Sequence, residues 1–162
     1  MHRGNVVEAV HRVHAVAVQD GAVIAEAGDP ALVSFMRSSS KPLQALPLAR
    51  AREDLDARDL AIASASHLAD DAQLSAVRAL LAKAPASVDE LECGPEGDPP
   101  SPLNHNCSGK HVGMLALCRA QGWPSGGYRL ADHPVQRAML SVHADAAEVG
   151  RASCRERVFA VV

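Results

Sequence analysis

Large aromatic side chains are almost absent from this chain, and this limits what its core can be. The 162 residues include one Trp, one Tyr and two Phe, although 48% of the residues are hydrophobic. A core of Leu, Val and Ala has no bulky rings to fill wide gaps, which favours close packing of slim helices and strands. The hydrophobic content is typical of a folded globular domain and excludes a disordered tail.

The charge pattern argues against two classes of partner. The formal net charge is −3 and acidic and basic residues are interleaved, so we expect no binding to nucleic acid. No stretch approaches the ~20 apolar residues that span a bilayer, and no secretion signal is visible, so we expect no membrane association. The four cysteines are irregularly spaced and too few for a disulfide scaffold, which predicts free thiols in a cytoplasmic protein.

Two segments predict strands. Residues 6–27 hold Val-rich runs on either side of Gln19-Asp20-Gly21, a polar turn ending in glycine that is typical of a hairpin. Farther along, residues 60–64 (LAIAS) are a short apolar run that we interpret as a buried strand.

Four segments predict helices from their start and stop signals. In residues 37–52, Pro42 suits a first turn, whereas Pro47 implies a kink or a late start. The other three helices are expected from Asp70 or Asp71 to Ala84, from Cys107 or Ser108 to Gly122, and from about Asp132 past Val142. Four prolines and two glycines in residues 92–106 predict a loop. The alternation of strands and helices predicts a mixed α/β layer fold.

Ser38 and Lys41 form a Ser-x-x-Lys motif, whose helical spacing would bring the hydroxyl and the amine to one face. A lysine removes a serine proton only when burial favours its neutral amine. On these residues alone, a simpler interpretation is that Ser38 to Ser40 cap a helix and that Lys41 is solvated.

A second cluster, HNCSGKH, runs from His105 to His111 and places two histidines, a thiol and an amine at the head of a predicted helix. That position favours the thiolate, which is the form of cysteine that binds zinc. Gly109 would let other groups approach the backbone closely. The alternatives are that Cys107 is a small buried apolar residue and that the histidines are loop and surface residues.

Ser66 and His67 follow the expected strand at residues 60–64, which is where α/β proteins often place site residues. They could act as nucleophile and base, but adjacent residues at a strand end point to opposite faces. We therefore interpret them as separate contributors to a site or as an ordinary loop start.

Taken together, several strings resemble the L-asparaginase II family, in order from about Arg3 to Val149. The matching strings are RGNVVEAVHR from Arg3, Gly28-Asp29-Pro30, RSSSKPLQA from Arg37, Ala65-Ser66-His67, Cys93-Gly94-Pro95 and HNCSGKHVGML from His105. RSSSKPLQA followed at this distance by HNCSGKHVGML is a specific combination. The resemblance implies an α/β fold akin to serine β-lactamases, with a mixed, largely antiparallel sheet flanked by helices.

The resemblance also implies an activity, the hydrolysis of L-asparagine to L-aspartate and ammonia. Ser38 and Lys41 would form one serine–lysine pair, and Ser66 would belong to a second. We favour Ser38 as the nucleophile. The full-length protein is expected to be a homodimer.

A zinc site is part of the same expectation. Cys107 and Lys110 would be ligands of Zn²⁺, an unusual pairing because the amine must lose its proton to bind a metal. Arg37, His67 and His111 would contact the substrate or fix the ligands and the nucleophile. Because a serine nucleophile is present, we expect zinc to orient the substrate or the site.

The last residues depart from the family. After the helix near Val142 the family should present an Asp-Gly-Cys string that supplies an acid and a further zinc ligand, and this chain has none. Instead, residues 150–158 (GRASCRERV) look like the translation of a sequencing adapter. We therefore expect residues 1–149 to be the N-terminal part of one asparaginase domain and residues 150–162 not to be native, so that Cys154 is not counted as a ligand. On this interpretation the chain is truncated and inactive alone.

Two other functions stay open at this point. A serine–lysine pair would equally serve a hydrolase of another amide, such as glutamine or a β-lactam, and only a substrate panel separates these activities. A non-catalytic remnant that binds a metal or a partner would fold stably and turn over no amide.

Overall fold

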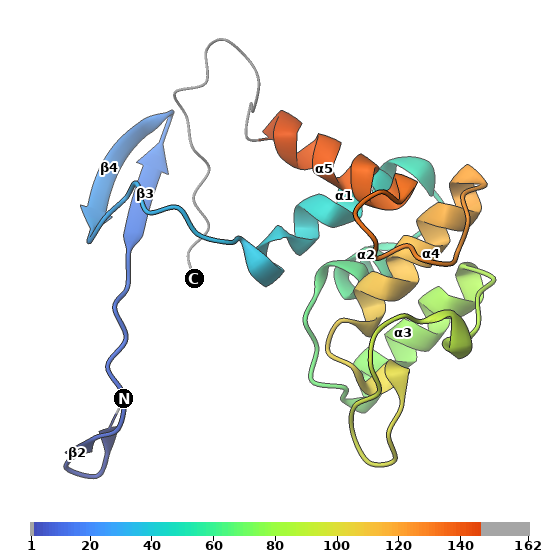
Figure 1. Cartoon of the computed structure of the whole chain (residues 1–162), viewed down its shortest axis with the longest axis horizontal. Helices are drawn as coiled ribbons and strands as arrows, with labels where there is room; N and C mark the ends of the chain where they lie inside the picture. The colour runs from blue at the N-terminus through green and yellow to red at the C-terminus, as the bar shows by residue number, and fades with distance from the viewer. Residues whose placement is uncertain (1, 147–162) are drawn as a thin grey trace.

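Helices dominate residues 2–146, the part of the chain that the computed structural model describes (Figure 1). The helices are η1 (Arg37–Ser40), α1 (Lys41–Ala51), α2 (Ala57–Ser64), α3 (Asp71–Lys83), η2 (Val88–Glu90), η3 (Pro102–Asn104), α4 (Ser108–Gln121) and α5 (Pro134–Ala146). The strands are β1 (His2–Arg3), β2 (Val6–Val7), β3 (Ala15–Gln19) and β4 (Ala22–Ala27). They form two separate antiparallel pairs. The expected antiparallel strands are therefore present, but residues 2–146 contain no large sheet flanked by helices.

The predicted hairpin is confirmed as β3 and β4. Asp20 and Gly21 connect the strands with φ angles of 51° and 76°. A two-residue turn with both φ angles positive matches the right-handed twist of the strands, which is why a glycine is favoured there. The pairing shifts register between Ala17 and Val18, so that Ile24 has no partner in β3. In Figure 1 this hairpin lies apart from the helices.

The predicted strand at residues 60–64 is wrong, because these residues form the second half of α2. A capping box starts the helix: the Asp56 side chain accepts the backbone N–H groups of Arg58 and Asp59, and the Asp59 carboxylate accepts that of Asp56. Such caps satisfy the free N–H groups of a first turn. A short apolar run does not distinguish a buried strand from a buried helix, and here the cap decides.

The other helix boundaries agree with the sequence signals. Asp70 caps α3 in a second capping box with Gln73, α4 ends at Gly122 and α5 begins at Pro134. The helix α1 begins at Lys41 and runs through Pro47, so it does not start late. Within residues 2–146, every helix is too short or too polar to cross a lipid bilayer.

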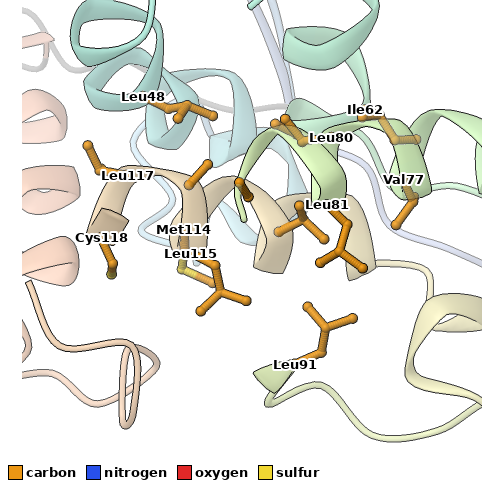
Figure 2. Packing of buried hydrophobic residues seen from close by; sticks show 14 of the residues in the cluster. Leu48, Ile62, Val77, Leu80, Leu81, Leu91, Met114, Leu115, Leu117 and Cys118 are labelled. Carbon is orange, nitrogen blue, oxygen red and sulfur yellow. The ribbon is translucent and has the colours of Figure 1, made fainter. Parts of the chain in front are cut away.

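The core is centred on α4. Every residue from Val112 to Cys118 is buried. A helix that is apolar all round is one covered on several sides, and α1, α2, α3 and α5 all pack against α4. Figure 2 shows side chains of these helices, among them Leu48 and Leu80, gathered around α4 and its Leu115. The predicted core of slim aliphatic side chains is confirmed, and Tyr128 is the one aromatic within residues 2–146 that is fully buried.

Candidate active site

The Lys41 side chain lies where three helices meet. Only 3% of this residue is exposed, so the interpretation of a solvated lysine is wrong. Its Nζ donates a hydrogen bond to the carbonyl of Ala65, just past α2, at 2.9 Å. It also lies 3.2 Å from Sγ of Cys107, which is the N-cap of α4. The amine is thereby held between α1, α2 and α4.

Ser66 supplies the hydroxyl that this amine reaches. Nζ of Lys41 lies 2.7 Å from Oγ of Ser66, which follows α2 by two residues and is exposed. A hydroxyl that is open to solvent and also bonded to an amine can meet a substrate and give up its proton. Of the predicted catalytic residues, the structure therefore brings Lys41 and Ser66 together.

Ser38 and Arg37 lie on the exposed turn η1. The backbone carbonyl of Ser38 accepts the N–H of Lys41, but its hydroxyl has no hydrogen-bond partner among the described residues. Arg37 has a φ of 47°, a left-handed conformation that is uncommon outside glycine. Its carbonyl accepts a hydrogen bond from Ser40 Oγ at 2.7 Å. The Ser-x-x-Lys spacing thus gives a contact between the backbones of Ser38 and Lys41 and not between their side chains. The role of Ser38 as the nucleophile stays a prediction.

His67 is buried, and its hydrogen bonds link the loop after α2 to the start of α4. Its Nδ1 accepts the N–H of Ala69 at 3.1 Å, so its Nε2 carries the proton and donates to Ser108 Oγ at 2.8 Å. Ser108 Oγ in turn donates to the Leu103 carbonyl at 2.8 Å. Burial, followed by the charge of Lys41, lowers the pKa of His67 and favours this neutral form. Ser66 and His67 are therefore separate contributors, and His67 holds the backbone beside the serine.

His111 lies one turn into α4 and contacts Tyr128, which the sequence analysis did not single out. The backbone N–H of Glu92 donates to the Tyr128 hydroxyl at 2.7 Å, and that hydroxyl lies 2.8 Å from His111 Nδ1. Burial and the neighbouring Lys110 lower the pKa of His111 to about 4. These contacts fit a neutral imidazole whose Nδ1 accepts a hydrogen bond from the tyrosine O–H. The one sequence signal was that Tyr128 is the only tyrosine of the chain.

Gly109 explains how α4 comes so close to α2. A Cβ atom at Gly109 would lie 2.3 Å from the carbonyl oxygen of Ile62, which is closer than such atoms can approach. Only glycine allows the first turn of α4 to pack directly on α2. The close approach expected at Gly109 is therefore confirmed, and this contact brings Cys107 next to Lys41.

The comparison with family models agrees with these motifs. The model described as L-asparaginase II matches residues 1–156, almost the whole chain. The chain belongs to the L-asparaginase II family. A comparison with curated proteins found no match. Family membership suggests an asparaginase-type hydrolase that acts on asparagine. The family match extends over residues 150–156, which lie outside the described residues, so the expectation that residues 150–162 are not native stays a prediction.

The zinc site that the asparaginase resemblance implies is only partly supplied by these residues. Burial lowers the pKa of the Lys110 amine, which favours the neutral form that a metal ligand needs. Cys107 Sγ, one turn earlier, is bonded to Lys41 and to Asn106 Oδ1, the latter at 2.9 Å. No group of three His, Cys, Asp or Glu within residues 2–146 could hold a metal ion. Because zinc sites use three or four protein ligands, Cys107 and Lys110 would need at least one more.

Proposed function

We propose that this asparaginase-type protein hydrolyses L-asparagine to L-aspartate and ammonia with Lys41 as the base and Ser66 as the nucleophile. The contact of 2.7 Å between Lys41 Nζ and Ser66 Oγ carries the proposal. A serine hydroxyl is a weak nucleophile until a neighbouring base accepts its proton, and among the described residues Lys41 is the base that contacts Ser66.

The reaction follows from this contact. The neutral amine of Lys41 accepts the proton of Ser66 as the hydroxyl oxygen attacks the side-chain amide carbon of asparagine. Lys41 then returns the proton to the amide nitrogen, which leaves as ammonia. Water hydrolyses the resulting ester and releases aspartate. The carbonyl of Ala65 accepts a hydrogen bond from Nζ and keeps the amine oriented during both transfers.

Ser38 remains the second candidate for the nucleophile. It is exposed on η1, and its backbone carbonyl accepts the N–H of Lys41, so the two residues are neighbours. The geometry favours Ser66 because its hydroxyl already makes that contact without rearrangement.

The experiment measures ammonia release from L-asparagine by the purified full-length protein and by its variants Ser66→Ala and Ser38→Ala. Loss of the nucleophile should lower kcat by at least about 10³-fold. Ser64→Ala is the matched control, because its hydroxyl is used to bond the Leu60 carbonyl within α2. A large loss in Ser38→Ala with activity retained in Ser66→Ala would transfer the role to Ser38. Turnover of glutamine or a β-lactam without turnover of asparagine would reject the substrate.

Zinc binding by Cys107 and Lys110 is a separate proposal. The lowered pKa of the Lys110 amine supports it, and at least one further ligand would be needed. Metal analysis of the dialysed protein should give close to one zinc per chain, and Cys107→Ser should lower that ratio. An unchanged ratio in Cys107→Ser would reject this ligand pair.

Two properties of the whole protein are also proposals. A homodimer would be visible by sedimentation as twice the mass of one chain. A cytoplasmic location would place the protein in the soluble fraction after cell disruption. Neither enters the chemistry proposed above.

A further inference from the structure

A thiol and an amine lie in contact at the candidate active site. Cys107 Sγ and Lys41 Nζ are 3.2 Å apart. The amine is held in place by the Ala65 carbonyl and by Ser66 Oγ, and the lysine is buried. The thiol hydrogen is used on Asn106 Oδ1, which leaves a sulfur lone pair facing the amine. The hydrolysis proposed above uses the amine but not the thiol, whose one role so far is as a ligand in the separate zinc proposal.

The thiol can be reached from solvent, whereas the other two thiols within residues 2–146 are poorly placed to pair with it. Cys107 is half-buried, so a small oxidant has access to its sulfur. Cys118 lies eleven residues along the same helix, roughly 16 Å away at ~1.5 Å per residue, which is too far for a disulfide. Cys93 is buried and its Sγ donates to the Pro102 carbonyl at 3.4 Å. The group in contact with the sulfur is therefore an amine.

We propose that the Cys107–Lys41 pair is a site of reversible covalent modification, in which a peroxide oxidises the thiol and the lysine then closes a sulfur–nitrogen bond. In the first step the sulfur attacks hydrogen peroxide, the O–O bond breaks, and the products are a sulfenic acid and one water. The sulfur is oxidised by two electrons and the peroxide is reduced by two.

The second step needs no further oxidant. The lone pair of Lys41 Nζ attacks the sulfur, the S–O bond breaks, and the hydroxyl leaves as water with a proton from the amine. Cysteine sulfenic acids condense in this way with backbone nitrogen. Here the nitrogen that is hydrogen-bonded to the sulfur is a side-chain amine. The product is a sulfenamide that joins α1 to the start of α4. An external thiol reverses it by attacking the sulfur and releasing the amine.

The modification would remove the amine that bonds Ser66. If the proposed hydrolysis is correct, the joined protein is inactive and a thiol reductant restores it. The covalent bond itself is independent of that function, because it is detected by mass and not by turnover.

The test is peptide mapping of the protein after treatment with hydrogen peroxide in the presence of EDTA. Because only a neutral amine attacks, the reaction is run near pH 9, where about 4 per cent of ordinary lysine side chains are neutral. Cleavage after acidic residues, without a reductant, gives three separate peptides. Bonds before proline (Asp29–Pro30 and Asp98–Pro99) stay uncut, so Lys41 falls in residues 27–53, Cys93 in residues 93–96, and Cys107 in residues 97–132 together with Lys110.

We expect a joined pair of the peptides 27–53 and 97–132 that is lighter than their sum by two hydrogen atoms. It should disappear after treatment with dithiothreitol, in Cys107→Ser, and when the protein is oxidised in denaturing urea. It should persist in the matched control variants Cys93→Ala and Lys110→Arg. Because the native protein itself is mapped, the result does not depend on whether a variant folds.

Other products would overturn the proposal. A disulfide that joins the peptide 93–96 would show that Cys93 is the partner, and an internal link within residues 97–132 would implicate Lys110 or the backbone. Oxidation of Cys107 to sulfinic or sulfonic acid without a joined pair would show that the amine does not capture the sulfur. Equal yields in native and urea-treated protein would show that the fold plays no part.

Discussion

The helical region, residues 36–146, and the strand region, residues 2–35, use the same aliphatic residues in opposite ways. In the helical region Val77, Val112 and Leu115 are completely buried. In the strand region Val23 and Ile24 are 56% and 62% exposed, although they are adjacent and strand geometry directs neighbours to opposite faces. The hydrophobic pattern therefore predicted regular structure in both regions. Within residues 2–146, however, only the helical region buries these apolar side chains.

The difference also locates the chemistry. Lys41, Ser66 and Cys107 all come from ends of helices whose middles are fixed in the core. Side chains carried by a packed framework keep a defined spacing, which catalysis requires. None of the candidate site residues comes from β3 or β4. If this comparison is correct, changes in the helical core should disturb the site, and similar changes in the hairpin should not.

The largest contrast should come from shortening one aliphatic side chain in each region. Leu115→Ala removes a fully buried side chain from the centre of α4 and should lower the free energy of unfolding by about 4 kcal/mol. Ile24→Ala changes an exposed side chain and should alter it by less than ~0.5 kcal/mol. Urea denaturation followed by circular dichroism measures both. Equal losses would break the comparison.

The contact between α2 and α4 can be tested next. Gly109→Ala would force its new methyl group against the Ile62 carbonyl, so the helices must separate, at a loss of about 3 kcal/mol. Gly126→Ala is the control, because nothing lies within 4 Å of its Cβ position. Thermal melts of both variants would decide. An unchanged melting temperature for Gly109→Ala would mean that this close approach is not what positions Cys107.

Acid should weaken the helical region through His111. Its pKa is lowered from 6.5 to about 4 in the folded protein, by burial and by Lys110, His105, Lys41 and Arg129. Between those values the unfolded chain binds a proton that the folded protein does not, so stability falls as the pH decreases from 6.5 toward 4.

His111→Gln should flatten that pH dependence. Because the side chain is partly screened by solvent, we expect the variant to lack about 2 kcal/mol of the change in the free energy of unfolding over this pH range. Urea midpoints at several pH values measure it for both proteins. Parallel curves would show that His111 is not the group responsible.

The smallest expected effect is at the start of α3. Asp70→Ala removes the side chain that caps the helix through the Gln73 N–H, bonded at 2.8 Å, and should cost about 1 kcal/mol. Asp71→Ala, one residue later and without a capping bond, is the control. If both variants lose the same stability in urea, the loss comes from charge at the helix end and not from the cap.

Local signals in the sequence were sufficient for most elements. Asp70, Gly122 and Pro134 marked helix ends because caps and breakers act through their own backbone. The segment at residues 60–64 was misread because its apolar run fits either a strand or a helix, and the deciding cap at Asp56 lies four residues earlier. The large sheet that residues 2–146 lack was expected from the family resemblance and from the alternation of predicted strands and helices, in which residues 60–64 were taken for a strand.

The candidate site was harder to predict because its contacts join distant parts of the chain. The spacing of Ser38 and Lys41 suggested a hydroxyl–amine contact between them, but Lys41 bonds a serine 25 positions later. The spacing of residues within one helix does not predict which distant loop packs against the first turn of that helix. The HNCSGKH cluster was correctly expected at a helix start, whereas its contact with Lys41 required the packing of α4 on α2.

The most direct measurement is to find which serine an asparagine analogue labels. An analogue that carries a reactive diazoketone in place of the side-chain amide would be incubated with the purified protein, and the labelled residue identified by mass spectrometry. The account predicts a label on Ser66, lost in Ser66→Ala and protected by excess L-asparagine. A label on Ser38, or no label on either serine, would contradict it.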